Sequence, residues 1–409
     1  MDSGSIEITK FELDNFGNKL NLSAFVSEIS IFESIYSPFI TGRMLLNDAA
    51  GLSDRIIWAG SKVLITFTSN EKVEPVTYRF VVDSIKNVES YSLDKKQTFT
   101  VEMYSEELVR AVSITTGEMF NKQSPEDMIK TILNDKIKTE KKFIYEKTSS
   151  LDSINCANLR PFQAIDKIKK RAVSRSKKSS SFMFFENQHG YNFKTVESML
   201  ADARNNQQIK EGDRNFYLDS MSHLGVENTS WRQILGYKKN VSQSYIETII
   251  NGGVSGKIFA YDINTGEHHE FTYDDRKDSP GFDINSKSVT YKRVSIDNIK
   301  KTGDNVSGVV VAPVTGIDDL ERIKKEIIVK AFMTKILSNI VSINIYGDSR
   351  MTVGTPVKIN IPIIDNTTSV RTSEISGGVY LISKIRHVIG PALEEYNQSC
   401  ELIRTGMFE

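Results

Sequence analysis

The densest group of residues that could bind a metal ion is Glu267-His268-His269-Glu270. Imidazole and carboxylate groups are the usual protein ligands of zinc and related ions. The turn signal Asn264-Thr265-Gly266 precedes this group, so we expect it on one strand of a β-hairpin. Adjacent side chains of a strand point to opposite faces, and two neighbouring imidazoles cannot easily share one ion. We therefore predict an exposed hairpin and no metal site here.

Other chemical signatures are weaker still. Asp274, Asp275 and Asp278 could hold calcium, but the ligand spacing of an EF-hand is absent. The sequence contains no glycine-rich phosphate loop, nucleophile elbow or zinc-protease helix. Paired carboxylates for glycoside hydrolysis assemble in space rather than in sequence, so a cell-wall hydrolase stays an alternative. We predict no catalytic, cofactor-binding or metal-binding residues and no cofactor.

One stretch is strongly basic. A phosphate-binding patch is one interpretation, and a solvated helix face with its tip is the other. Few aromatic residues interleave with the charges, as they would in a surface that stacks nucleic-acid bases, and this favours the solvated helix. The basic residues are Lys167, Lys169, Lys170, Arg171, Arg175, Lys177 and Lys178.

The first 110 or so residues are predicted to be strands, because apolar and polar residues alternate along them. Leu20 to Val26 follow one phase of this alternation, and Ile29 and Ile31 follow the other. Because a slip of one residue exchanges the two faces of a strand, we predict a bulge or corner at Ser27-Glu28.

The middle of the chain has helical signals. Ser124-Pro125-Glu126-Asp127 combines a capping serine, a proline at the first helical position and two acids in the first turn. Pro161 begins a second predicted helix, with Ala164, Ile165, Ile168 and Ala172 on one apolar stripe. A hairpin is predicted around the turn at residues 187–190. These elements indicate an α+β insert.

Strand periodicity returns toward the end of the chain. Asp318 to Leu337 has the strongest helical pattern, and Val341, Ile343 and Ile345 resume the two-residue period. We predict a β-rich α+β fold with two similar barrel-like β domains and a smaller insert. The predicted boundaries are 1–112 for the first β domain, 113–235 for the insert, 236–275 with 317–409 for the second β domain, and 276–316 for an inserted loop region.

The two β domains are predicted to be duplicates. Each contains, in the same order, a small-residue turn with a strand, a strand ending in a basic–apolar step, and a strand that opens on glutamine. Three ordered matches at similar spacing favour an internal duplication. Residues 59–67, 83–88 and 97–103 correspond to residues 353–361, 383–388 and 398–404.

Bulk composition narrows the functional class. The 409 residues are 39% hydrophobic and 25% charged, with 52 basic and 52 acidic side chains. The zero net charge argues against a general nucleic-acid or membrane binder. Cys156 and Cys400 form no metal or disulfide pattern, and Cys400 is expected to be a buried thiol. We expect no signal peptide and no membrane span, and synthesis in a reducing cytoplasm.

With these elements in place, the chain resembles the baseplate central hub proteins of contractile-tailed phages, especially the T-even type. The resemblance spans nearly the whole length, and its motifs are moderately specific as a set. The family has no catalytic signature, so no active-site residue is carried over. The motifs are residues 31–36 (IFESIY), 40–48 (ITGRMLLND), 160–165 (RPFQAI) and 191–200 (YNFKTVESML).

The resemblance implies a non-enzymatic virion protein. Three chains would form a ring with two tube-type domains each, joining a sixfold tail tube to a threefold spike around a channel for DNA. The implied partners are two further copies of the chain, a spike or lysozyme-type protein, a tail-tube or tube-initiator protein and the baseplate wedges. DNA would be present only in transit, and stable membrane insertion is not expected. The alternative is the hub of a related contractile injection system, such as type VI secretion.

Overall fold

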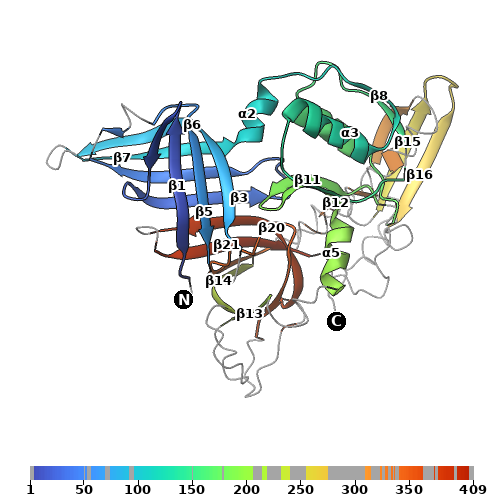
Figure 1. Ribbon diagram of the computed structural model, residues 1–409. Helices are drawn as coiled ribbons and strands as arrows, with labels where there is room; N and C mark the ends of the chain where they lie inside the picture. The colour runs from blue at the N-terminus through green and yellow to red at the C-terminus, as the bar shows by residue number, and fades with distance from the viewer. Residues whose placement is uncertain are drawn as a thin grey trace.

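A computed structural model of the chain is shown in Figure 1. It describes residues 4–49, 51–52, 57–69, 74–91, 96–149, 151–176, 179–205, 214–218, 232–239, 255–274, 309–314, 340–362, 376–390 and 394–404, with 323–324, 328–329, 333–334, 336 and 373.

The first β module is a curved antiparallel sheet. Its strand order is β2-β1-β5-β6-β7-β4-β3. Apolar side chains of alternate residues fill its concave side and form one core, which includes Phe11, Ile31, Ile65 and Val101. The strands are β1 (Glu7–Asn15), β2 (Asn18–Asn21), β3 (Val26–Ser34), β4 (Thr41–Asp48), β5 (Lys62–Thr68), β6 (Val76–Tyr91) and β7 (Lys96–Ser105).

The second β module is a closed barrel. Its strands follow the order β19-β13-β14-β18-β21-β20, and β20 pairs back onto β19. A second core fills this barrel. The strands are β13 (Asn215–Leu218), β14 (Gln233–Lys239), β18 (Ile340–Tyr346), β19 (Pro356–Asn360), β20 (Gly378–Ile389) and β21 (Tyr396–Ile403).

Several segments lie elsewhere than the sequence assigned them. Residues 309–314, placed in the inserted loop region, form a strand, and residues 106–112, placed in the first β domain, form a helix whose Ala111 joins the core of the insert. Residues 215–218, placed in the insert, form β13 of the barrel. Residues 255–274, placed in the second β domain, form β15 (Ser255–Asp262) and β16 (His268–Asp274) of a separate sheet with β17 (Val309–Val314). The alternating pattern of 255–274 fits any half-buried strand, so it could not identify which sheet the strands join.

The modules are duplicates in strand order. Strands β3, β4, β7, β6 and β5 follow one another across the first module as β14, β18, β21, β20 and β19 do across the second. Both copies carry a register shift at the same point of the long strand, between Val82 and Ser84 in β6 and between Ile382 and Lys384 in β20. The sequence segments 63–67 and 357–361, which were predicted to be equivalent, thus begin on the equivalent strands β5 and β19.

A second bulge is also repeated. β3 shifts register between Val26 and Glu28, which confirms the bulge predicted at Ser27. β14 shifts between Ile234 and Gly236 at the same place relative to its neighbour. Bulges are specific local features, so their repetition identifies equivalent residues, not just similar strands.

The register corrects the third sequence match. Glu102 lies opposite Ser84, and Glu401 lies opposite the equivalent Lys384. The sequence had matched Gln97 with Gln398, which is two residues out of step. A shift of two residues leaves the same side chains on each face, so alternation alone could not detect it.

The two modules join through one strand pair. The first residues of β20 pair with β19, and residues Lys384–Ile389 pair along the same edge with β3. This pairing makes one continuous sheet of thirteen strands. In Figure 1 the red β20–β21 pair lies directly below the blue first module.

The insert packs beside this sheet around a third core. Its helices begin as predicted: the Ser124 side chain accepts a hydrogen bond from the Asp127 backbone, and Pro161 is the first residue of α4. Its elements are α2 (Glu106–Val112), β8 (Met119–Gln123), α3 (Pro125–Thr131), a π-helix η1 (Ile132–Ile137), β9 (Phe143–Tyr145), β10 (Asp152–Asn155), α4 (Pro161–Lys169), β11 (Phe182–Asn187), β12 (Gly190–Thr195) and α5 (Val196–Asn205).

Some predictions fall largely outside the described residues. Of the helix predicted over 318–337, the described residues are helical, and Ile323 and Ile336 are buried. Cys400 is buried as predicted, and Cys156 is buried too. No described helix has the length and apolar character needed to span a membrane.

Candidate functional site at the junction of the modules

The β3–β20 pair connects the two modules on its outer face through a small polar cluster. Arg386 of β20 donates to Glu28 at 3.1 Å and to the Ser30 hydroxyl at 2.9 Å, both on β3. The same guanidinium lies 5.6 Å from the ring centre of Phe32. Exposed ion pairs contribute little stability, so the backbone pairing carries most of this contact.

Behind this face, Glu33 lies fully buried between the modules. It occupies the inward row of β3, which Ile29, Ile31 and Ile35 also occupy. Its carboxylate accepts a hydrogen bond from Tyr78 of the first module at 2.8 Å. It also accepts bonds from the Thr352 hydroxyl and the Val353 backbone, both in the loop before β19. One carboxylate therefore binds groups from both modules.

His387 of β20 faces the same buried space. Its Nδ1 lies 2.7 Å from the Tyr396 hydroxyl and 3.1 Å from the Gln398 amide. Its Nε2 has no hydrogen-bond partner among the described residues and lies 3.9 Å from Glu33. Burial lowers the pKa of His387 to about 3, so the imidazole is neutral.

Burial also acts on Glu33, in the opposite direction. It raises the pKa of this carboxyl to about 7, against the hydrogen bonds from Thr352, Tyr78 and Val353 that favour the ionised form. Glu33 and His387 are 2% and 1% exposed. An acid–base pair can act on a substrate only where the substrate can reach it, so this geometry favours a structural role.

A second buried cluster joins the insert to the first module. The Lys141 ammonium lies 2.6 Å from Glu107 of α2 and 2.5 Å from Glu186 of β11. Glu186 also accepts the Ile40 backbone N–H, just before β4. The lysine thus neutralises two buried carboxylates, one of which binds the first module directly.

Lys141 and Glu107 favour each other's charged forms, whereas Glu186 is only partly compensated. Burial opposes the charge on Lys141, but the two carboxylates outweigh it and raise its pKa. Burial likewise opposes ionisation of Glu107, but Lys141 and Thr139 lower its pKa overall. For Glu186 burial outweighs Lys141, and its pKa is raised.

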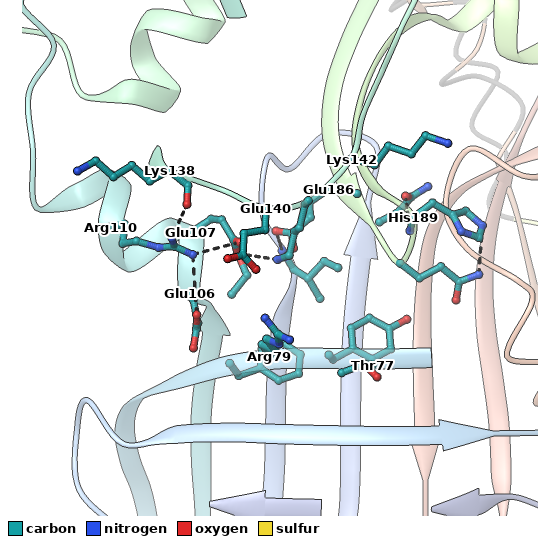
Figure 2. Close-up of a pocket in the computed structure, with 18 residues that line it drawn as sticks. Thr77, Arg79, Glu106, Glu107, Arg110, Lys138, Glu140, Lys142, Glu186 and His189 are labelled. Carbon is teal, nitrogen blue, oxygen red and sulfur yellow. Dashed lines mark hydrogen bonds and ion pairs between the residues drawn. The ribbon is translucent and has the colours of Figure 1, made fainter. Parts of the chain in front are cut away.

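A cavity of about 470 Å³ opens beside this cluster (Figure 2). It is bounded by β6, α2, residues 138–142 and the turn between β11 and β12. Arg110 reaches across its rim to the Lys138 carbonyl at 2.8 Å. The backbone is close at Gly190, where an added Cβ would lie 2.2 Å from the Lys142 carbonyl oxygen. Acidic and basic side chains alternate around the wall and select no single ligand charge.

The histidine pair predicted to be exposed lies on β16, far along the chain from this junction. His268 is exposed, and its ring centre lies 4.9 Å from that of Tyr261 on β15. His269 lies on the other face, 3.7 Å from Glu267. Glu270 forms an ion pair with Lys257 at 2.5 Å. Within the described residues, no three His, Cys, Asp or Glu side chains group as metal ligands do. Asp275 and Asp278 fall outside those residues.

The basic run lies on α4 and the residues after it. Asp166 binds Lys169 at 2.8 Å and Lys170 at 2.9 Å, and Lys167 donates to the Asn155 carbonyl. These local pairs fit the solvated helix face. Lys177 and Lys178 fall outside the described residues.

No sequence motif had pointed to a role for the buried residues Glu33, Glu107, Lys141, Glu186 and His387. A usable signal existed for two of them. Glu33 and His387 each interrupt an apolar row of alternate residues on a strand, and a polar residue in such a row must find a buried partner. The charged group of Glu107, Lys141 and Glu186 had no such signal, because its members lie on α2, a loop and β11.

No protein-family model matches the sequence, and no curated protein matches it. Solved structures do match the fold. A tail protein from Neisseria meningitidis aligns with a TM-score of 0.58 at 8% identity, over 97% of each chain. The 43 kDa tail protein of prophage MuSo2 from Shewanella oneidensis aligns with a TM-score of 0.59 at 11% identity, over 98% of each chain. The chain therefore has the fold of these two tail proteins.

Proposed function

We propose that this chain is a structural hub of a phage tail baseplate, in which three copies form a ring of six β modules. The observation that carries the proposal is the duplicated module, with five equivalent strands and two repeated bulges joined edge to edge in one chain. Two equivalent modules per chain let a threefold assembly present six similar places.

The ring would join a sixfold tail tube to a threefold spike around an axial channel through which DNA passes. The likeness to two tail proteins over nearly their whole length supports a place in the tail. The further partners in this proposal are the tube or tube-initiator protein, the spike protein and the surrounding wedges.

We also propose that the chain is not an enzyme. Glu33 and His387, whose pKa values burial displaces in opposite directions, are sealed between the modules, and Glu33 accepts hydrogen bonds from both of them. Zymography on peptidoglycan tests this part, and a cleared band from the purified chain would contradict it.

The assembly is tested by mass measurement of the chain alone and with the tail particle, followed by particle imaging. Three copies per ring, with both modules in the ring wall, is the expected result. Six copies per ring, or one module outside the wall, would refute the proposal. A monomeric free chain is compatible with it, because a partner can drive assembly by mass action.

A further inference from the structure

The internal duplication predicts where one copy of the chain meets the next. Within a chain, residues Lys384–Ile389 of β20 pair with β3 after β20 has left β19. The equivalent strand of the first module is β6, which pairs with β5 over residues 76–81 and then extends further. Among the described residues, no strand pairs with that edge of β6 beyond Val82.

The complementary edge is also present in the second module. The strand equivalent to β3 is β14, with the same bulge and the same neighbour relation to β18. β13 pairs with β14 only at Gln233 and Ile234. No described strand pairs with the same edge of β14 over Leu235–Lys239.

Among the described strands, these two edges do not pair with each other. The sheet runs β14-β18-β21-β20-β3-β4-β7-β6, which puts six strands between β14 and β6. At about 4.8 Å per strand step, the two edges lie roughly 34 Å apart along the sheet. Unpaired edges are a pairing hazard that assembly can remove.

We infer that β6 of one copy pairs with β14 of the next, antiparallel and in the register that β20 and β3 use within the chain. The inference deepens the proposed ring, on which it rests, by naming the contact between copies. The occupant of each edge is a second copy of this chain, because the edge it must match is already built into the other module. Ring contacts then alternate between β20–β3 within a chain and β6–β14 between chains.

The register follows from the cross-strand partners, although β6 has one extra residue between Lys86 and Glu89 that β20 lacks. Val388 lies opposite Asn397 and Glu89 lies opposite the equivalent Thr98, so Glu89 corresponds to Val388. In the same way Lys238 corresponds to Ser30, the residue that faces Val388. Glu89 of one copy therefore faces Lys238 of the next. Both side chains are exposed in the single chain, and opposite charges across a strand pair are favourable.

Disulfide trapping tests the contact in the full chain. The Glu89→Cys, Lys238→Cys double variant is oxidised at the concentration, or with the tail partner, at which the chain assembles. We expect a ladder on a non-reducing gel that ends at three chains. The native thiols Cys156 and Cys400 are buried and do not contribute. Val388→Cys with Ser30→Cys is the positive control and forms its bond within a chain. Lys130→Cys with Lys238→Cys is the exposed but unmatched control.

The outcomes separate the inference from the proposed function. A trimer that forms normally, with no β6–β14 bond while the positive control closes, overturns this contact and leaves the hub intact. An assembled particle with a single copy of the chain refutes the hub itself. As a second measurement, Lys238→Glu should reduce trimer formation at least tenfold, and adding Glu89→Lys should restore it. No rescue by the charge swap would also count against the contact.

Discussion

The two β modules share a framework of five strands and differ in the strand that enters the remaining gap. In the second module β13 runs parallel to both β19 and β14, and the barrel closes. In the first module β1 pairs antiparallel with β5, and the edge of β3 that does not face β4 pairs with β20. Closure is thus decided by one strand outside the repeated framework, not by the framework itself.

Equivalent positions of the two modules fill the same space with different pairs of side chains. Gly42 faces Met103 in the first module, and Val341 faces Leu402 in the second. The flexible methionine side chain covers the glycine, while valine and leucine share the space more evenly. The pairs fill one site in two ways, so each pair has to be treated as a unit.

The insert is held differently by the two modules. It meets the first module through the charged group Glu107, Lys141 and Glu186. It meets the second through apolar side chains of α5, including Met199 and Leu200, which join the barrel core. Ionic contacts of this kind specify a geometry, whereas apolar contacts supply most of the burial energy.

The largest expected effect comes from breaking the charged contact. Lys141→Ala leaves two buried carboxylates uncompensated and should lower the free energy of unfolding by about 3 kcal/mol. Urea denaturation at neutral pH measures it, with the exposed Lys130→Ala as the control. If both variants have the same free energy of unfolding, the charged cluster does not stabilise the contact between the insert and the first module.

A second prediction concerns the pH dependence of the junction between the modules. The pKa of Glu33 is raised from 4.5 to about 7 in the folded chain, so this group loses stability as pH rises through that window. The pKa of His387 is lowered from 6.5 to about 3, so this group gains stability as pH rises. Between pH 4.5 and 6.5 the two slopes oppose each other.

Single variants should separate these slopes, each about 1.4 kcal/mol per pH unit. Glu33→Gln keeps only the slope of His387, so its free energy of unfolding should rise by about 3 kcal/mol as the pH is raised from 4.5 to 6.5. His387→Gln keeps only the slope of Glu33, so its free energy of unfolding should fall by about as much over the same range. The unmodified chain should change by less than either. Urea midpoints across this range measure it, and parallel curves for all three proteins would show that the pair does not titrate as described.

A third, smaller effect is expected at the Gly42–Met103 pair, which is equivalent to Val341–Leu402. In Gly42→Val the added Cβ would lie 2.7 Å from the Met103 methyl carbon, and overpacking of this kind costs about 1–3 kcal/mol. Adding Met103→Leu copies the pair of the second module and should restore part of the loss. A double variant no more stable than Gly42→Val would break the equivalence of these positions.

The smallest effect is expected on the outer face. Glu401 pairs with Lys384 at 3.0 Å, and the equivalent Glu102 pairs with Lys86 and Arg43. Lys384→Ala should cost about 0.2–1 kcal/mol, and added salt should reduce the difference. A loss as large as that of Lys141→Ala would mean that this exposed ion pair stabilises the fold as much as the buried charged cluster does.

The sequence predicted the duplication, the Ser27 bulge and the helix starts at Ser124 and Pro161. These features depend on local patterns of alternation, capping and proline geometry. It could not assign β13 or β15 to the right sheet, because pairing partners separated by many residues leave no mark on a short strand. The junction was missed for the same reason, since Glu33 and Thr352 meet only once both modules are formed.

The β3–β20 pair has a consequence for how the chain folds during synthesis. Its partners lie far apart in sequence, with Ser30 and Arg386 separated by 356 residues. At about 5–20 residues per second, β3 leaves the ribosome roughly 20–70 s before β20 does. For that interval the first module has an open edge where its neighbour will lie. A newly made chain is then most prone to pair with the wrong molecule while still unfinished, and slower translation after residue 300 should lower the yield of correctly folded protein.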